Sequence, residues 1–177
     1  MRVISGKYKG KVLKSPSSDN IRPTGDKVKQ ALFTKLQFFV NDSVVLDLFA
    51  GSGALGIEAL SRGAKKVFFV DKDARSIKLL KENLKGLDGE HKVISCDYLK
   101  ALDLVDQQCD LIILDPPYAS GVYDGALQKI YDLNLLNDEG IIVCEHPNSL
   151  QINTPFEVFD AKRYGTVTLT YMQHKKN

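Results

Sequence analysis

The fold of this chain is decided by the stretch Val44-Val45-Leu46-Asp47-Leu48-Phe49-Ala50-Gly51-Ser52-Gly53-Ala54-Leu55-Gly56. Its apolar start predicts a buried strand over 44–48, and the glycines that follow predict a tight turn into a helix over 54–62. Strands and helices then keep alternating along the chain. We expect further strands at 66–70, 92–95, 110–114 and 140–144, and helices at 74–87, 98–104 and 123–133. This alternation predicts an α/β protein with a mostly parallel sheet and helices on both faces.

The two ends of the chain follow other patterns. Short strand-like runs at 2–5 and 10–14 surround Gly6-Lys7-Tyr8-Lys9-Gly10 and predict a basic β-hairpin, followed by a helix over 26–40. Runs at 156–163 and 166–171 predict a terminal antiparallel pair. The 177 residues show no linker or repeat, so we expect one domain at 1–177, with 1–40 as an extension of a core at 41–177.

Charge is distributed unevenly between the two parts. Residues 1–36 carry nine Lys or Arg against two Asp, a net charge of +7, whereas the whole chain has +2. A positive end of this kind favours a polyanionic partner. There is no apolar run near the roughly 20 residues that span a membrane and no signal peptide at the start, so we expect a cytoplasmic protein. Three scattered cysteines without a CxxC motif predict buried free thiols and no zinc site.

The glycine-rich turn allows two interpretations. Gly51, Gly53 and Gly56 fit the pattern GxGxxG, and Asp71 ends the next strand where a ribose-binding acid is expected, which favours a dinucleotide oxidoreductase. Asp47 argues against it, because its carboxylate would repel a pyrophosphate. The same carboxylate suits a ligand with ammonium and sulfonium groups. S-adenosylmethionine has both, and its own carboxylate can bind amides at a helix start.

Two more acids follow later strands. Asp97, in Cys96-Asp97-Tyr98, could accept from an adenine amine, although a lone Asp at this place is typical of a helix N-cap. Asp115-Pro116-Pro117-Tyr118 closes the apolar run at 111–114. The prolines stiffen the backbone, so the Asp115 carboxylate and the Pro116 carbonyl can hold a planar group with an exocyclic amine. Acids at successive strand ends predict a nucleoside cleft.

Two other segments carry weaker signals. Arg22-Pro23-Thr24 could reach the methyl donor or a nucleic acid, and a helix-entry loop is nearly as good an interpretation. Glu145-His146-Pro147-Asn148 follows the last parallel strand, and we expect a capped turn there without assigned chemistry.

These motifs resemble a known family. Asp47-x-x-x-Gly51-x-Gly53, Asp71, Asp97 and Asp115-Pro116-Pro117-Tyr118 look like the motif series of class I S-adenosylmethionine-dependent methyltransferases that act on exocyclic amines. The segments 1–10, 21–24, 31–33 and 55–64, with Tyr164-Gly165, resemble the RsmD-type bacterial 16S ribosomal RNA guanine-N2 methyltransferases. The resemblance spans nearly the whole chain. Departures are Lys27 and Lys29 in place of the usual Arg, Thr34 in place of a frequent Asn, and Asp71 in place of a common Glu.

The resemblance implies a Rossmann-like fold, with a seven-stranded sheet whose last strand is antiparallel and an N-terminal β-hairpin. It implies methylation of the N2 amine of one guanine in 16S ribosomal RNA, inside a small-subunit particle, with S-adenosylmethionine converted to S-adenosylhomocysteine and no metal. We expect a monomer. The expected residues are catalytic Asp115, Pro116 and Tyr118; donor-binding Asp47, Phe49, Gly51, Gly53, Asp71, Asp97 and Tyr98; and RNA-binding Lys7, Lys9, Lys11, Arg22, Thr24 and Lys27.

Other functions remain open at the level of sequence. A DNA adenine-N6 methyltransferase can share the Asp115-Pro116-Pro117-Tyr118 motif, although this length leaves no room for a separate target-recognition domain. A non-catalytic RNA-binding ribosome assembly factor would have no need of the acid series. A small-molecule N-methyltransferase would leave the basic N-terminal segment unexplained.

Overall fold

The computed structural model of the chain describes residues 1–16, 25–117 and 121–177. Within these ranges the helices are α1 (Gly25–Lys35), α2 (Ala54–Ser61), α3 (Ala74–Leu84), α4 (Tyr98–Leu104) and α5 (Val122–Asp132). The strands are β1 (Val44–Asp47), β2 (Lys66–Asp71), β3 (His91–Ser95), β4 (Cys109–Leu114), β5 (Leu136–Pro147), β6 (Glu157–Tyr164) and β7 (Val167–Gln173). The predicted alternation of strands and helices is therefore confirmed.

The seven strands form one sheet in the order β3-β2-β1-β4-β5-β7-β6. The first five pair in parallel, whereas β7 runs antiparallel to both β5 and β6. All four residues of β1 are buried, as is typical of a central parallel strand that is covered on both faces. The expected mostly parallel sheet with an antiparallel last strand is thus confirmed.

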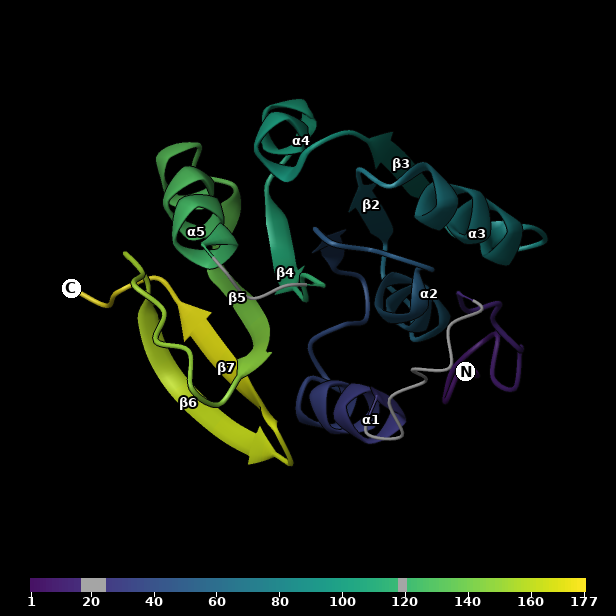
Figure 1. The fold of residues 1–177 in the computed structure, drawn as a ribbon, viewed down its shortest axis with the longest axis horizontal. Coiled ribbons are helices and arrows are strands. Elements are labelled where there is room, and N and C mark those ends of the chain that lie inside the picture. The colour runs from purple at the N-terminus through teal and green to yellow at the C-terminus, as the bar shows by residue number, and fades with distance from the viewer. Residues whose placement is uncertain (17–24, 118–120) are drawn as a thin grey trace.

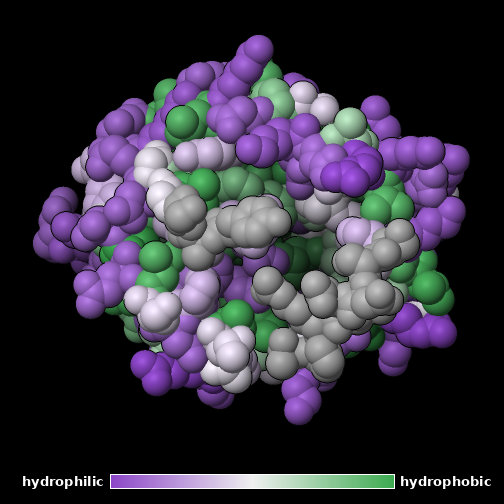
Figure 2. Space-filling model, viewed as in Figure 1, coloured by the Kyte–Doolittle hydropathy of each residue, from purple (hydrophilic) through white to green (hydrophobic). Residues whose placement is uncertain are grey.

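The helices divide between the two faces of the sheet (Figure 1). One hydrophobic cluster joins α1, α2 and α3 to the sheet through residues such as Leu32, Ile57 and Leu80. A second cluster joins α4 and α5 to the opposite face through residues such as Leu102 and Leu127. Each fully buried aliphatic or aromatic side chain contributes about 1.5–3 kcal/mol, so these two layers dominate the stability of the fold. Figure 2 shows a mostly hydrophilic surface with a hollow near its middle, where hydrophobic residues form the floor.

The basic N-terminal segment pairs as a hairpin but forms no extended strands. A single antiparallel bridge joins Arg2 and Val12, and the Val3 amide donates to the Lys11 carbonyl at 3.0 Å. Val3 and Leu13 are buried in the cluster of α1, α2 and α3. The predicted hairpin is confirmed in its pairing, and burial of its two apolar residues fixes it to the core.

Several predicted boundaries were wrong. The helix expected over 26–40 ends at Lys35 and continues as turns. Strand β5 starts at Leu136 and runs on to Pro147, so the capped turn expected at 145–148 is largely strand. The reason is tertiary, since β7 pairs with β5 as far as Pro147 and keeps that segment extended. No helix in the described ranges has the length and apolarity of a membrane span.

Candidate active site

The strand order brings the four predicted acids to one edge of the sheet. Asp97 follows β3, Asp71 and Asp47 end β2 and β1, and Asp115 follows β4. These strands are consecutive neighbours and all run parallel, so their carboxyl ends meet at the same edge. Ligands of open α/β sheets bind at such an edge, at the point where the strand order reverses. Here that point lies between β1 and β4.

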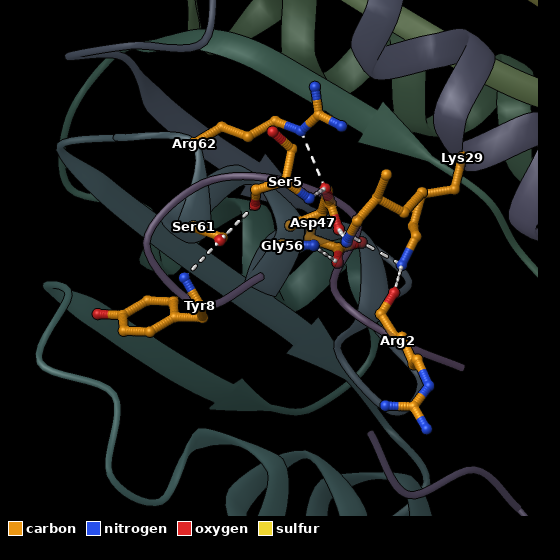
Figure 3. Close-up of polar contacts among 10 residues, drawn as sticks. Arg2, Ser5, Tyr8, Lys29, Asp47, Gly56, Ser61 and Arg62 are labelled. Atoms are coloured by element: carbon orange, nitrogen blue, oxygen red, sulfur yellow. Dashed lines mark hydrogen bonds and ion pairs between the residues drawn. The ribbon is translucent and has the colours of Figure 1, made fainter. Parts of the chain in front are cut away.

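Asp47 is the most buried of these acids, with 1% of its surface exposed. Its Oδ2 accepts the Gly56 amide of α2 at 3.0 Å (Figure 3). The other oxygen, Oδ1, is buried and has no hydrogen-bond partner among the described residues. Burial raises the pKa of Asp47 from 3.8 to about 7, and the nearby Asp71 adds to this rise. A buried acceptor without a partner is costly unless a donor or cation from a ligand meets it.

Asp71 shapes the glycine-rich turn. Its Oδ2 accepts the Gly51 amide at 2.8 Å and its Oδ1 accepts the Asp73 amide at 2.9 Å, so the turn after β1 is tied to the end of β2. Gly53 has a φ of +90°, and a Cβ there would lie 2.4 Å from the Leu80 side chain. Only glycine fits, so the turn packs closely against Leu80 of α3 at the start of α2.

Asp97 and two aromatic residues form the next part of the edge. The Asp97 carboxylate accepts the Leu99 amide at 3.0 Å and caps α4, as the simpler interpretation of this residue predicted. Phe49, after β1, packs against Tyr98 of α4 with 5.4 Å between the ring centroids. The two rings connect the turn after β1 to the start of α4, and they provide an apolar surface next to the acids.

A small cavity lies beside the Asp115 turn. It has a volume of about 50 Å³ and is lined by Asp115, Pro116, Pro117, Tyr123, Glu145, His146, Pro147 and Val167. His146 is held by Thr170, with 2.7 Å between Nε2 and Oγ1, so it has a structural role. Tyr118, which we predicted to be catalytic, lies outside the described residues. A larger hollow of about 230 Å³ at 138–139 and 173–176 lies at the far end of β5, away from the acids.

The predicted RNA-binding residues differ in their surroundings. Lys7 forms an ion pair with Asp88 at 2.6 Å, and Lys11 Nζ donates to the Lys85 carbonyl at 3.3 Å. Both lysines therefore help dock the hairpin beside the end of α3. Lys9 and Lys27 are exposed to solvent. Arg22 and Thr24 lie outside the described residues.

Sequence reasoning missed a buried ion cluster centred on Glu58, which is 0% exposed. Figure 3 shows this cluster, with Ser5, Lys29 and Arg62 labelled. Its carboxylate accepts the amides of Ile4 and Ser5 at 2.9 and 3.1 Å and the Arg62 Nε at 2.9 Å. Lys29, 2% exposed, places its Nζ 3.5 Å from Glu58 and donates to the Arg2 carbonyl. The one available signal was a Glu inside the apolar run of α2. The cluster fastens the hairpin to the helix that starts at the glycine-rich turn.

No metal site accompanies these residues. In the part of the chain that the structure describes, no three His, Cys, Asp or Glu side chains are grouped so as to hold an ion.

The sequence matches a family model over residues 1–173, described as conserved hypothetical protein 95. A ribosomal RNA small subunit methyltransferase D of Haemophilus influenzae is 36% identical, and the match covers 98% of this chain and 94% of that protein. The protein of the same name from Escherichia coli is 34% identical over 82% of this chain and 74% of its own.

Solved structures give the same result. The yhhF protein of Escherichia coli, described provisionally as a methyltransferase, has a TM-score of 0.86 and 30% sequence identity. Each of the two chains is covered to 99%. The chain therefore belongs to the family of conserved hypothetical protein 95, the RsmD-type methyltransferases, and is a methyltransferase.

Proposed function

We propose that this protein methylates the exocyclic N2 amine of a guanine in 16S ribosomal RNA, with S-adenosylmethionine as the donor and S-adenosylhomocysteine as the product. The proposal is supported by relatives that are named small subunit ribosomal RNA methyltransferases. The observation that carries it is the row of acids on neighbouring strand ends next to the stiff Asp115-Pro116-Pro117 turn. In this proposal, residues 41–177 form the catalytic core, and residues 1–40 contribute to RNA binding.

The residues of the edge fit the proposed donor. The unpartnered Asp47 Oδ1 suits its ammonium group, and the open space beside Gly51 leaves room for its methionine end. Asp71 would accept from the ribose hydroxyls with its remaining lone pairs, and Asp97 from the adenine amine. Phe49 and Tyr98 offer an apolar wall for the adenine ring. The donor supplies an electrophilic methyl group on a sulfonium sulfur.

The acceptor side relies on positioning. The guanine N2 lone pair is delocalised into the ring, so the free amine is a poor nucleophile. The Asp115 carboxylate and the Pro116 carbonyl would accept its two N–H bonds and hold the nitrogen as it becomes tetrahedral. Correct positioning can contribute about 7–11 kcal/mol to lowering the barrier. Asp115 or water takes the leaving proton, and Tyr118 stacks on the base in this proposal.

RNA binding would use the basic N-terminal segment. Lys9 and Lys27 are exposed to solvent, and Lys7 and Lys11 lie at the surface of the docked hairpin. Contacts of such residues with phosphates give an affinity that falls as the salt concentration rises. The base must leave its stack to reach the cavity at Asp115. We propose that the protein acts as a monomer in the cytoplasm on a small-subunit particle.

The test compares wild type with Asp115→Ala in transfer of tritiated methyl groups to small-subunit ribosomal particles and to their naked RNA. We expect the variant to lose about 100-fold or more in rate, because the amine is no longer held. Asp138→Ala, at the opposite edge of the sheet, is the matched control and should keep full activity. Equal incorporation by wild type and Asp115→Ala would refute the proposed mechanism.

Added substrates separate the other functions. Labelling of adenine in DNA would indicate the DNA methyltransferase, and binding of NADH in place of S-adenosylmethionine would indicate an oxidoreductase. RNA binding without methyl transfer would indicate an assembly factor. Mass spectrometry of ribosomal RNA from cells that lack the protein would identify the nucleotide that loses its methyl group.

A further inference from the structure

Glu145 lies beside Asp115 at the same edge of the sheet. In the parallel ladder of β4 and β5, Leu114 pairs with Cys144. The next residue on each side is Asp115 and Glu145, so their backbones are neighbours, and both residues line the small cavity next to Pro116. A second carboxylate is thus placed one strand away from the group that is proposed to hold the amine.

The side chain of Glu145 projects toward the face of the sheet to which Asp47 also points. Side chains alternate along a strand, so residues two apart share a face. Glu145 is two residues after Val143 and Asp47 is two residues after Val45, and both valines belong to the cluster of α1, α2 and α3. A base that reaches Asp115 from the donor side of the sheet therefore meets Glu145 as well.

The position of Glu145 is fixed by the fold. Strand β5 lies between β4 and β7, and Glu145 pairs with Leu169 of β7. The Tyr123 hydroxyl of α5 also donates a hydrogen bond to the Glu145 carbonyl. The residue is half-buried. The backbone of Glu145 is thus held from three sides. A carboxylate on such an internal strand can read a hydrogen-bond pattern more strictly than one on a loop.

Guanine and adenine differ at the atom that such a carboxylate would meet. Guanine carries the N1–H donor next to its N2 amine, whereas N1 of adenine is an acceptor. An ionised Glu only accepts hydrogen bonds, so it pairs with N1–H and repels an unprotonated N1. Enzymes that extrude a base read it by hydrogen bonds to this same edge.

We propose that Glu145 is a specificity residue, which accepts the N1–H of the target guanine while Asp115 and Pro116 hold its N2 amine. This inference rests on the proposed function. It assigns a role to a residue beyond the donor and amine sites, and it gives a physical reason for guanine over adenine.

The test uses two versions of the RNA that wild type methylates, after mass spectrometry has located the methylated nucleotide. One carries guanosine there and the other 2-aminopurine, which keeps the C2 amine but has no N1–H. Rates of methyl transfer give kcat/KM for each RNA with wild type, Glu145→Gln and the control Glu139→Gln. Glu139 is an exposed residue on the same strand, so its substitution makes the same charge change far from the cavity.

We expect wild type and Glu139→Gln to prefer guanosine over 2-aminopurine by about 10- to 100-fold, the discrimination typical of a well-placed base contact. In Glu145→Gln the preference should fall by about tenfold, because an amide can donate to an unprotonated N1 as well as accept from N1–H. The affinity for S-adenosylmethionine, measured by calorimetry, should stay at the wild-type value. If Glu145→Gln instead lowers the affinity for S-adenosylmethionine by the same factor as it lowers kcat/KM for the guanosine RNA, Glu145 has a structural role and the inference is overturned.

The outcomes separate the two proposals. If wild type methylates the guanosine RNA and Glu145→Gln keeps the full preference, only the role of Glu145 is refuted. If mass spectrometry finds no guanosine whose N2 methylation depends on this protein, the proposed function fails and the inference fails with it.

Discussion

Asp47 makes the structure less stable in exchange for a charge at the donor site, and Asp47→Asn tests this. Burial raises the pKa of Asp47 from 3.8 to about 7. Because the folded-state value lies above the unfolded one, the folded chain binds more protons between about pH 4 and pH 7. The stability that the protonated Asp47 side chain gives to the fold is therefore fully present below pH 4, and it is lost as the pH rises to 7. At pH 8 the ionised carboxylate costs about 4 kcal/mol, at about 1.4 kcal/mol for each pKa unit.

The asparagine variant removes this cost and adds a smaller one. Its carbonyl can keep the hydrogen bond from the Gly56 amide, which Asp47 Oδ2 accepts at 3.0 Å. Its amide group then occupies the place of the unpartnered Oδ1, at a cost of about 1–3 kcal/mol for a buried unsatisfied donor. We expect Asp47→Asn to be more stable than wild type by about 1–3 kcal/mol at pH 8. At pH 5 this advantage should shrink by about 3 kcal/mol, because folded wild type is mostly protonated there.

Urea unfolding followed by circular dichroism at pH 5 and pH 8 measures both differences. Calorimetry at pH 8 should show S-adenosylmethionine binding weakened about tenfold or more, since a charged hydrogen-bond partner is lost. Asp138→Asn, at an exposed site, serves as the control and should change neither quantity. The reasoning is refuted if the difference in stability between Asp47→Asn and wild type is the same at pH 8 and pH 5. It is also refuted if the variant binds the donor as tightly as wild type.

Two further predictions concern the attachment of the hairpin to α2. Glu58→Ala should lower the free energy of unfolding by about 3–5 kcal/mol, because Lys29 would stay buried without its ion-pair partner. Gly6→Ala should lower it by more than about 2 kcal/mol, because a Cβ at Gly6 would lie 1.8 Å from the Ser61 carbonyl oxygen. Gly10→Ala shares the positive φ but has open space around its Cβ, so it should cost only about 1 kcal/mol. Urea unfolding measures all three variants.

Control variants show whether burial and close contact cause these losses of stability. Glu90 forms an ion pair with Lys66, and the Glu90 side chain is 64% exposed. Glu90→Ala should therefore change the free energy of unfolding by less than about 1 kcal/mol. An equally small effect of Glu58→Ala would mean that the buried cluster does not fasten the hairpin. Equal effects of Gly6→Ala and Gly10→Ala would show that backbone strain, and not contact with Ser61, limits substitution at Gly6.

Local pattern was enough to predict most of the architecture. Apolar runs closed by turn residues gave the strands, helical spacing gave the helices, and strict alternation gave a parallel sheet. Acids just after such runs were expected at one sheet edge, because parallel strands end on the same side. Asp47, Asp71, Asp97 and Asp115 do lie at or just after the carboxyl ends of four adjacent strands. Their roles toward a donor and a base remain predictions.

Tertiary structure alone decided the features that depend on residues far apart in the chain. Lys29 belongs to the basic N-terminal segment, yet it is buried against Glu58 of another helix. Glu145 was assigned to a turn until pairing with β7 showed it to be strand, next to Asp115. Periodicity reports which face of its own element a residue occupies. Which element covers that face, and at what register, is set by packing between distant segments, and no local pattern encodes it.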